Sequence, residues 1–160
     1  MVKNNLFFIK NIDSIVFFGF SSSFNDLIQI NKSFKIPTDI ISSTDQSKNL
    51  KIDHLIFDKI DNFFFDHLES KYEIEKTLFI SLGSRLVFNK KAINFLKGNL
   101  INFHGTRLPY DSGGGGFSWK IMRQDRIDNQ LVHLIDAGID TGPIIDYKMS
   151  LFPKNCIIPY

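Results

Sequence analysis

The chain has 160 residues, of which 43% are hydrophobic and 22% charged, with a net charge of +2. These values are typical of one soluble globular domain that can bury a core, and the scattered lysines give no case for a nucleic-acid partner. Cys156 is the single cysteine, which excludes an internal disulfide and a multi-cysteine metal site. Because every apolar run is too short for a signal peptide or a membrane span, we expect a cytoplasmic protein without a membrane partner.

The N-terminal half of the chain predicts short strands that alternate with helices. Residues 14–20 form an apolar run that contains a glycine near its end, which is typical of a buried parallel strand. The hydroxyls of residues 21–23 can cap the next helix or help its N-terminus to hold an anion, and capping is the commoner use. No Gly-x-Gly-x-x-Gly follows the strand, which argues against a nicotinamide-dependent oxidoreductase. We expect further strands at residues 38–41 and 54–57 and a crossover helix at residues 60–68.

The middle of the chain predicts a βαβ unit. Residues 77–81 form a predicted strand, residues 89–96 form a predicted helix that ends at Gly98, and the next apolar run reaches Asn102. Such a unit is right-handed and places Asn102 at the carboxyl edge of the sheet, where open α/β sheets bind ligands. We therefore predict an α/β fold with a Rossmann-like, open, mostly parallel twisted sheet flanked by helices.

Polar side chains follow two predicted strands. Asn102 and His104 share one side at the end of residues 100–104, and Asp140 lies in the turn after a strand at residues 130–135. An amide, an imidazole and a carboxylate suit acyl transfer, because they supply oxyanion donors and a group that moves a proton. A carboxylate beside His104 favours the protonated imidazole, which can then donate to an oxyanion.

Three short motifs carry a resemblance to a known family. They are Asn102-x-His104, Leu108-Pro109 and Asp140-Thr141-Gly142-Pro143, with 36 residues from His104 to Asp140. This pattern resembles the signature of the folate-dependent formyltransferases, which include methionyl-tRNA, glycinamide ribonucleotide and amino-sugar N-formyltransferases. The resemblance covers residues 77–150. It implies formyl transfer from 10-formyltetrahydrofolate to a primary amine, with Asn102, His104 and Asp140 as catalytic residues and no metal.

The resemblance also implies a folate-binding set, drawn from three segments. Its members are Arg85, Leu86, Val87, Phe88, Thr106, Arg107, Leu108, Pro109, Asp136 and Gly138. For residues 85–88, a wall of the pterin pocket and ordinary helix packing are equally open interpretations. Thr106 supplies the hydroxyl of the family's serine, whereas Arg107 replaces a leucine and points to solvent or to the glutamate tail of folate. His133 matches a frequent family histidine, which we interpret as a supporting residue.

The loop after Pro109 departs from the family pattern. Residues 113–116 are four glycines, which lose much backbone entropy on ordering and predict positive-φ turns, close approach of a ligand or a mobile lid. Phe117 and Trp119, on the next predicted helix, are expected to pack in the core in preference to forming a stacking platform.

The acceptor is the least determined part of the prediction. Our first expectation is a nucleotide-linked amino sugar. The alternatives are methionyl-tRNA, glycinamide ribonucleotide, or a non-catalytic remnant that binds folate or a sugar nucleotide. Residues 151–160 hold two prolines and no closing helix, so we expect a single catalytic domain over residues 1–160 that lacks a C-terminal extension. A homodimer is compatible with the family.

Overall fold

The computed structural model describes residues 11–153, with only the backbone of Phe117. Within this range the strands are β1 (Ser14–Gly19), β2 (Thr38–Ser42), β3 (Leu55–Ile56), β4 (Thr77–Leu82), β5 (Leu100–His104), β6 (Ile127–Leu134) and β7 (Ile144–Leu151). The helices are α1 (Phe24–Ser33), α2 (Thr44–Ser47), α3 (Asn62–Lys71), the 3-10 turn η1 (Ile74–Lys76), α4 (Lys90–Phe95) and α5 (Gly116–Met122). None of these described helices has the length and apolar character needed to cross a membrane.

The described strands form one seven-stranded sheet in the order β3-β2-β1-β4-β5-β6-β7. Neighbours from β3 to β5 run parallel, whereas β6 is antiparallel to β5 and β7 is antiparallel to β6. Parallel neighbours need crossover connections, which the intervening helical segments supply. The predicted Rossmann-like, mostly parallel α/β fold is therefore confirmed.

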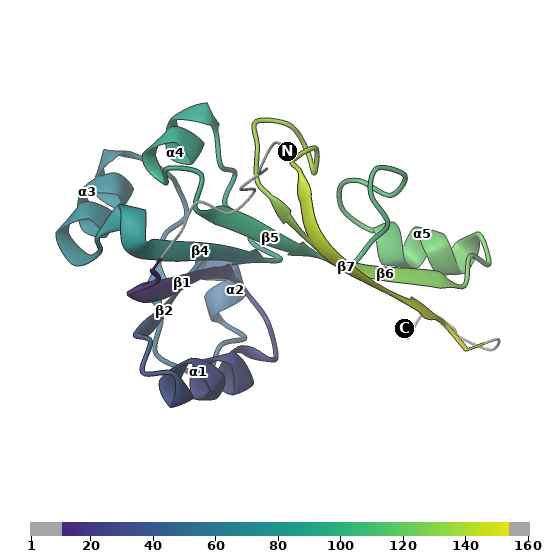
Figure 1. Ribbon diagram of the computed structural model, residues 1–160, viewed down its shortest axis with the longest axis horizontal. Helices are drawn as coiled ribbons and strands as arrows, with labels where there is room; N and C mark the ends of the chain where they lie inside the picture. Colours follow the sequence, from purple (N-terminus) through teal and green to yellow (C-terminus); the bar gives the residue numbers. More distant parts are fainter. Residues whose placement is uncertain (1–10, 154–160) are drawn as a thin grey trace, which may run out of the picture.

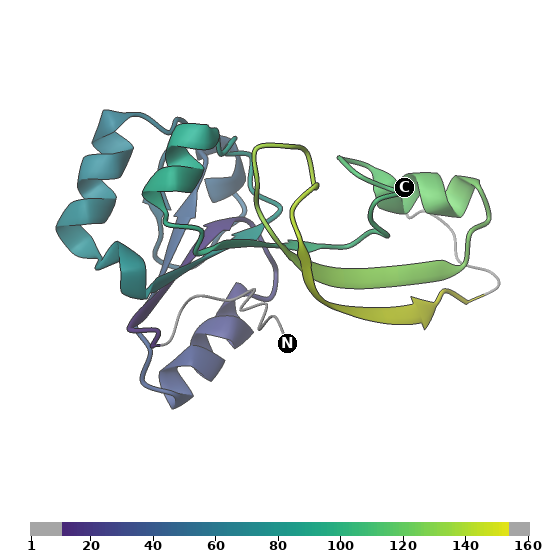
Figure 2. The ribbon, with the colours of Figure 1, turned by 45° about the horizontal axis from the view of Figure 1, so that its top comes forward.

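Helices cover both faces of the parallel part of the sheet (Figures 1 and 2). The period of two along the strands divides the core into two clusters, one on each face. The face under α3 and α4 buries Val16, Phe18, Phe64, Phe65, Leu68, Phe79, Ala92, Leu96 and Leu100. The opposite face, under α1, buries Ile15, Phe17, Phe24, Ile40, Leu78, Ile80 and Ile101. This two-sided core holds β4 and β5 rigidly, and β5 carries Asn102 and His104.

Capping residues decide where the helices beside the site begin and end. Asn89 accepts a hydrogen bond from the backbone N–H of Ala92 at 3.0 Å, which caps the start of α4. After the C-cap Leu96, Lys97 and Gly98 both adopt a positive φ, +55° and +74°, and turn the chain into β5. The predicted βαβ unit is therefore confirmed. The predicted crossover helix begins at Asn62 instead of residue 60, because Asp61 accepts from the N–H of Phe64 and caps it.

β6 and β7 extend beyond the parallel part of the sheet as a ribbon that carries α5 (Figure 2). Lys120 of α5 is fully buried and forms an ion pair with Asp128 of β6 at 2.8 Å. Its Nζ atom also donates to the carbonyl oxygen of Gly105 at 3.5 Å.

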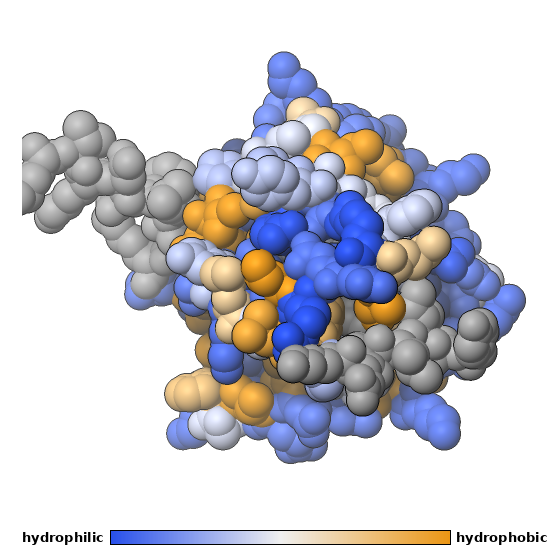
Figure 3. Space-filling model, turned by 90° about the vertical axis from the view of Figure 1, so that its right-hand side faces the viewer, coloured by the Kyte–Doolittle hydropathy of each residue, from blue (hydrophilic) through white to orange (hydrophobic). Residues whose placement is uncertain are grey.

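Trp119 is 58% exposed, so the expectation that it packs in the core is wrong, while the side chain of Phe117 lies outside the described part. At this end of the molecule, apolar surface forms separate patches between polar side chains (Figure 3).

Candidate active site

The junction between β5 and β6 brings an amide and an imidazole together. Asn102 is paired with His133 in the antiparallel register, and the Asn102 Nδ2 atom lies 3.1 Å from His133 Nε2. His104 follows on the same face of β5, because alternate strand residues share a face. The two strands thus present three polar side chains to one place, two from β5 and one from β6.

The turn between β6 and β7 brings in the carboxylate. One oxygen of Asp136 accepts from Thr141 Oγ1 at 2.6 Å and from the Gly138 N–H at 3.1 Å, which closes the turn. Asp140 adopts a φ of +53°, a left-handed conformation that non-glycine residues seldom take. Its Oδ2 atom accepts from the N–H of Gly113 at 2.7 Å, so the glycine loop holds the carboxylate in position.

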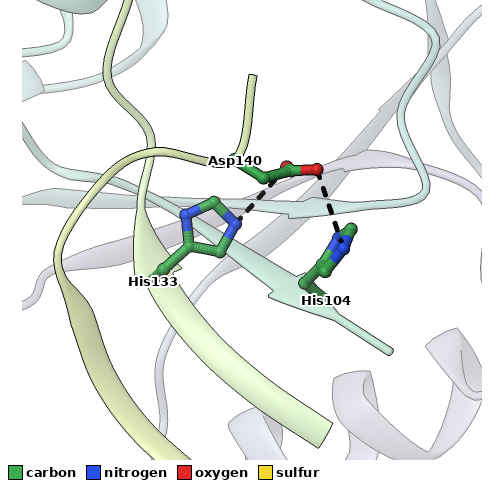
Figure 4. A group of neighbouring side chains, drawn as sticks. All are labelled: His104, His133 and Asp140. Atoms are coloured by element: carbon green, nitrogen blue, oxygen red, sulfur yellow. Dashed lines mark ion pairs between the residues drawn. The ribbon is translucent and has the colours of Figure 1, made fainter. Parts of the chain in front are cut away.

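Asp140 lies between two histidines (Figure 4). Its Oδ2 atom is 3.6 Å from His104 Nε2, and its Oδ1 atom is 3.7 Å from His133 Nε2. The His133 side chain is 2% exposed, and those of His104 and Asp140 are 14% and 16% exposed. Low exposure reduces solvent screening, so charge on one of these groups acts strongly on the others.

Hydrogen bonds define the donor and acceptor atoms of His133 and Asn102. His133 Nδ1 lies 2.8 Å from the carbonyl oxygen of Leu134, which can only accept, so Nδ1 carries a proton. In the neutral ring, Nε2 then accepts from the Asn102 amide. This contact orients the Asn102 side chain, and the amide keeps a second N–H for another acceptor.

His104 is held by a residue in the loop that follows β5. Its Nε2 atom is hydrogen-bonded to Thr106 Oγ1, and the Thr106 hydroxyl donates to the carbonyl oxygen of Asp111. Because that hydroxyl gives its proton to Asp111, it accepts from His104, and Nε2 is the donor. The arrangement leaves an imidazole N–H beside the Asp140 carboxylate.

A cavity of about 430 Å³ opens over these residues, a size that suits a small-molecule site. It is lined by residues from the end of β4, the segment before α4, β5, the glycine loop and the turn after β6. Asn102, His104 and Asp140 are all among the lining residues, so the structure brings together the three residues predicted to be catalytic.

The residues predicted to bind folate separate into two groups. Leu86, Val87, Phe88, Asp136 and Gly138 line the cavity, whereas Arg85, Thr106, Arg107, Leu108 and Pro109 are not among its lining residues. Arg85 points away and forms an exposed ion pair with Asp45 at 2.6 Å. Of the two interpretations of residues 85–88, a pocket wall therefore fits three positions and not Arg85.

The segment after β5 is occupied with contacts inside the protein. Thr106 is 5% exposed, and its hydroxyl bonds within the protein, which differs from the expected folate contact. Arg107 binds Asp125 at 2.8 Å and lies over the ring of Tyr110, and its side chain is 30% exposed. Leu108 is buried as well. These side chains fix the loop that supports the site.

Sequence reasoning missed the specific role of the glycine loop. Gly113 and Gly114 line the cavity, and the Gly113 amide binds the catalytic candidate Asp140. The run of four glycines did predict positive φ and close approach, and Gly113 has a φ of +82°. The sequence carried no signal for the partner, because 27 residues separate Gly113 from Asp140.

Comparisons with known proteins give relatives over part of the chain. A methionyl-tRNA formyltransferase from Clostridium beijerinckii is 26% identical over 80 residues, 50% of this chain and 26% of that protein. A phosphoribosylglycinamide formyltransferase from Mycobacterium tuberculosis is 31% identical over 71 residues, 44% of this chain and 33% of that protein. The matched segments thus span about a third or less of these relatives. No family model matches the chain.

Solved structures share the fold over most of the chain. Phosphoribosylglycinamide formyltransferase from Bacillus halodurans superposes with a TM-score of 0.69 at 18% identity, covering 90% of this chain and 82% of that one. The formyltransferase PseJ from Anoxybacillus kamchatkensis, solved with a UDP-linked formamido sugar and tetrahydrofolate, has a TM-score of 0.63 at 21% identity, covering 89% and 63%. A formyltetrahydrofolate deformylase from Pseudomonas syringae has a TM-score of 0.69 at 14% identity, covering 89% and 52%.

The open sheet, with an amide, an imidazole and a carboxylate at the end of β5, defines a protein with the formyltransferase fold. Sequence relatives and structural neighbours agree on this class. The chain is similar in sequence to folate-dependent formyltransferases over about half of its length, and it shares their fold over most of it. The resemblance carried by the three short motifs is confirmed.

Proposed function

We propose that the chain transfers a formyl group from 10-formyltetrahydrofolate to a primary amine. The observation that carries the proposal is the meeting of Asn102, His104 and Asp140 at the wall of one cavity of about 430 Å³. Oxyanion donors, a proton-transfer group and a concave site are the parts that acyl transfer requires.

The reaction begins when the amine nitrogen attacks the formyl carbon, and the carbonyl electron pair moves to oxygen. The free N–H of Asn102 and, in the protonated imidazole, the second ring N–H of His104 are the two donors available to that oxyanion. The attacking amine becomes cationic, and the Asp140 carboxylate accepts its proton directly or through a water molecule. Collapse of the tetrahedral intermediate breaks the bond to N10 of the folate, which takes up the proton held by Asp140, and tetrahydrofolate leaves.

His133 is a positioning residue in this mechanism. Its buried ring fixes the Asn102 amide through Nε2, while the Leu134 carbonyl fixes the ring itself. An oxyanion donor that is oriented before the reaction needs no reorganisation in the transition state, and such preorganisation supplies much of its catalytic effect.

The cavity wall before α4 fits the flat ring system of a folate. Val87 is 82% exposed although it lies in the wall of the cavity, and Phe88 lies next to it. An apolar side chain left exposed inside a concave site is a common feature of ligand pockets. Leu86, Val87 and Phe88 would hold the pterin, and Asp136 and Gly138 would line its other side, while the donor supplies the formyl group.

A nucleotide-linked amino sugar is our preferred acceptor. The support is the fold shared with PseJ, which was solved with a UDP-linked formamido sugar. Glycinamide ribonucleotide and methionyl-tRNA are the competing acceptors, because relatives with those names match parts of the chain. Water is a further competitor, because formyltetrahydrofolate deformylases share the fold.

Release of tetrahydrofolate from 10-formyltetrahydrofolate tests the proposal. The panel of acceptors holds 4-amino and 3-amino nucleotide sugars, glycinamide ribonucleotide, methionyl-tRNA and a sample without amine. We expect turnover with one sugar for the wild type and its loss in His104→Ala. His54→Ala is the matched control, because His54 bonds the Ile52 carbonyl and does not line the cavity. A folded wild type that turns over no acceptor would refute the proposal.

A further inference from the structure

Among the described residues, His104, His133 and Asp140 form a group of potential metal ligands whose ligand atoms lie within 4.8 Å of one another. The sequence predicted no metal cluster, because only the antiparallel pairing of β5 and β6 brings His133 to the site. We propose that these three residues bind one Zn²⁺ ion and that the ion blocks the active site. The binding stands on geometry alone, whereas the block of formyl transfer rests on the proposed function.

The distances are close to those that zinc requires. Two imidazoles and one carboxylate, with an open fourth position, form a known type of zinc site. In a tetrahedral site with bonds of about 2.0–2.1 Å, ligand atoms are about 3.4 Å apart. Asp140 Oδ2 lies 3.6 Å from His104 Nε2, and Asp140 Oδ1 lies 3.7 Å from His133 Nε2 (Figure 4). One ligand atom from each residue lies within 4.8 Å of the other two, so zinc needs a shift of a few tenths of an ångström at the carboxylate and of up to about 1.4 Å elsewhere in the group.

Supporting contacts orient two of the ligands. His133 donates its Nδ1 proton to the Leu134 carbonyl, which leaves Nε2 facing Asp140. Metal-ligating histidines commonly have such a partner on the other ring nitrogen, since it fixes the ring and its tautomer. The Gly113 amide holds the Asp140 carboxylate in the same way. Both ligands are therefore oriented before an ion arrives.

Two local changes would complete the site. Zinc displaces the Nε2 proton of His104, as it does from any imidazole that it binds, and so breaks the hydrogen bond to Thr106. Rotation of the Asn102 amide then places its oxygen, instead of its nitrogen, beside His133. This removes the amide N–H from a position in which the bound ion would repel it. The amide oxygen or a water molecule from the cavity then takes the fourth position.

Bound zinc and formyl transfer exclude each other. The ion takes the carboxylate that accepts the proton, the imidazole that donates to the oxyanion, and the histidine that orients Asn102. Formyl transfer should therefore fall as zinc binds, and a chelator should restore it.

The metal site is tested first without folate. Calorimetric titration of the full chain with Zn²⁺, after chelator treatment, is expected to show one ion per chain, and Co²⁺ is expected to give the visible absorption of tetrahedral coordination. His133→Ala and Asp140→Asn should each weaken binding by about a hundredfold or more, since loss of even a supporting contact costs ten- to a hundredfold. Asp140→Asn retains the side-chain shape, so it covers the case in which His133→Ala does not fold.

His54→Ala and Cys156→Ser are the controls, because a histidine or thiol elsewhere could hold zinc, and both should bind as the wild type does. A wild type that binds no ion, or binding that survives both ligand replacements, would overturn the inference. Formyl transfer is then assayed in chelator and with added Zn²⁺. Transfer without metal binding would leave the proposed function standing and refute the metal site. If the chain binds the metal but transfers no formyl group in chelator, the metal site stands and the proposed function is refuted.

Discussion

Asn102 on β5 and His133 on β6 face each other in the antiparallel pair, with the Asn102 amide nitrogen 3.1 Å from His133 Nε2. His133 is 1% exposed, and its other ring nitrogen bonds a backbone carbonyl. A buried ring with both nitrogens engaged cannot turn freely, so it acts as a fixed support for the amide. In the proposed mechanism this relationship separates Asn102, which contacts the substrate, from His133, which only orients Asn102.

Asn102→Ala and His133→Ala should slow the reaction to different extents. Asn102→Ala removes an oxyanion donor, so we expect kcat to fall about a hundredfold or more. His133→Ala keeps the donor and loses its orientation, so we expect about a tenfold fall, the rate equivalent of a hydrogen bond worth about 1.4 kcal/mol. Steady-state kinetics measure both, and KM for the folate donor should change little. His133→Gln, whose amide oxygen can accept the same bond, should recover part of the rate, and equal losses in both alanine variants would contradict the positioning role.

Thr106→Val should destabilise the protein and slow catalysis together. Valine keeps the shape of threonine but leaves His104 Nε2 and the Asp111 carbonyl without the hydroxyl that joins them. Unsatisfied buried polar groups cost about 1–3 kcal/mol, which chemical denaturation can measure. Thr106→Ser keeps the hydroxyl and should retain most of the activity. A valine variant that matches the wild type in both measurements would show that this hydrogen bond does not hold His104.

Gly142→Ala should disturb the turn that carries Asp140. A methyl group at Gly142 would lie 1.8 Å from the carbonyl oxygen of Leu134, whereas one at Gly114 would meet nothing within 4 Å. The backbone must move to relieve that clash, so we expect a loss of about 2 kcal/mol in unfolding free energy. Because Asp140 moves with the turn, kcat/KM should fall too. Gly114→Ala should leave stability unchanged or raise it by up to about 1 kcal/mol, through a less flexible unfolded chain.

Lys120→Met should strongly destabilise the ribbon that carries α5. Lys120 is fully buried, and its removal leaves the carboxylate of Asp128 without its cation, a change that costs about 3 kcal/mol. Replacing both partners with apolar residues, Lys120→Met with Asp128→Leu, should recover much of that loss, because no buried charge remains. Lys148→Met is the control at an exposed position of β7 and should change unfolding free energy by less than about 0.5 kcal/mol.

The ion pair between Lys120 and Asp128 should make the free energy of unfolding depend on pH. Burial raises the pKa of Asp128, but hydrogen bonds from Lys120 and Gln130 and the Lys120 charge outweigh it, so the pKa lies below its ordinary value. A depressed carboxyl pKa stabilises the fold above the unfolded value of about 3.9, and this contribution disappears as pH falls through the folded pKa. The gap in unfolding free energy between wild type and Lys120→Met should thus be constant near neutral pH and narrow below about pH 4. A gap that stays constant in acid would show that the pair does not lower the Asp128 pKa.

The local pattern of the chain was enough to predict the elements that build the site. Apolar runs, the helix-ending Gly98 and the alternation along a strand placed Asn102 and His104 together at the end of β5, as observed. These signals are local, because strand period and helix capping depend on residues only a few positions apart. The boundaries differed where a single capping residue decided them, as Asp61 does for α3.

Three features depended on tertiary structure instead. The pairing register of β5 and β6 set His133 beside Asn102, and packing of the glycine loop set the Gly113 amide on Asp140. Contacts with Asp45 and Asp125 drew Arg85 and Arg107 away from the cavity. By itself the sequence predicted the α/β fold, the resemblance to the formyltransferases and the meeting of Asn102, His104 and Asp140, because these follow from short motifs and their spacing. Only the tertiary structure decided which neighbours hold those side chains, because such contacts join residues far apart in the chain whose pairing no local pattern specifies.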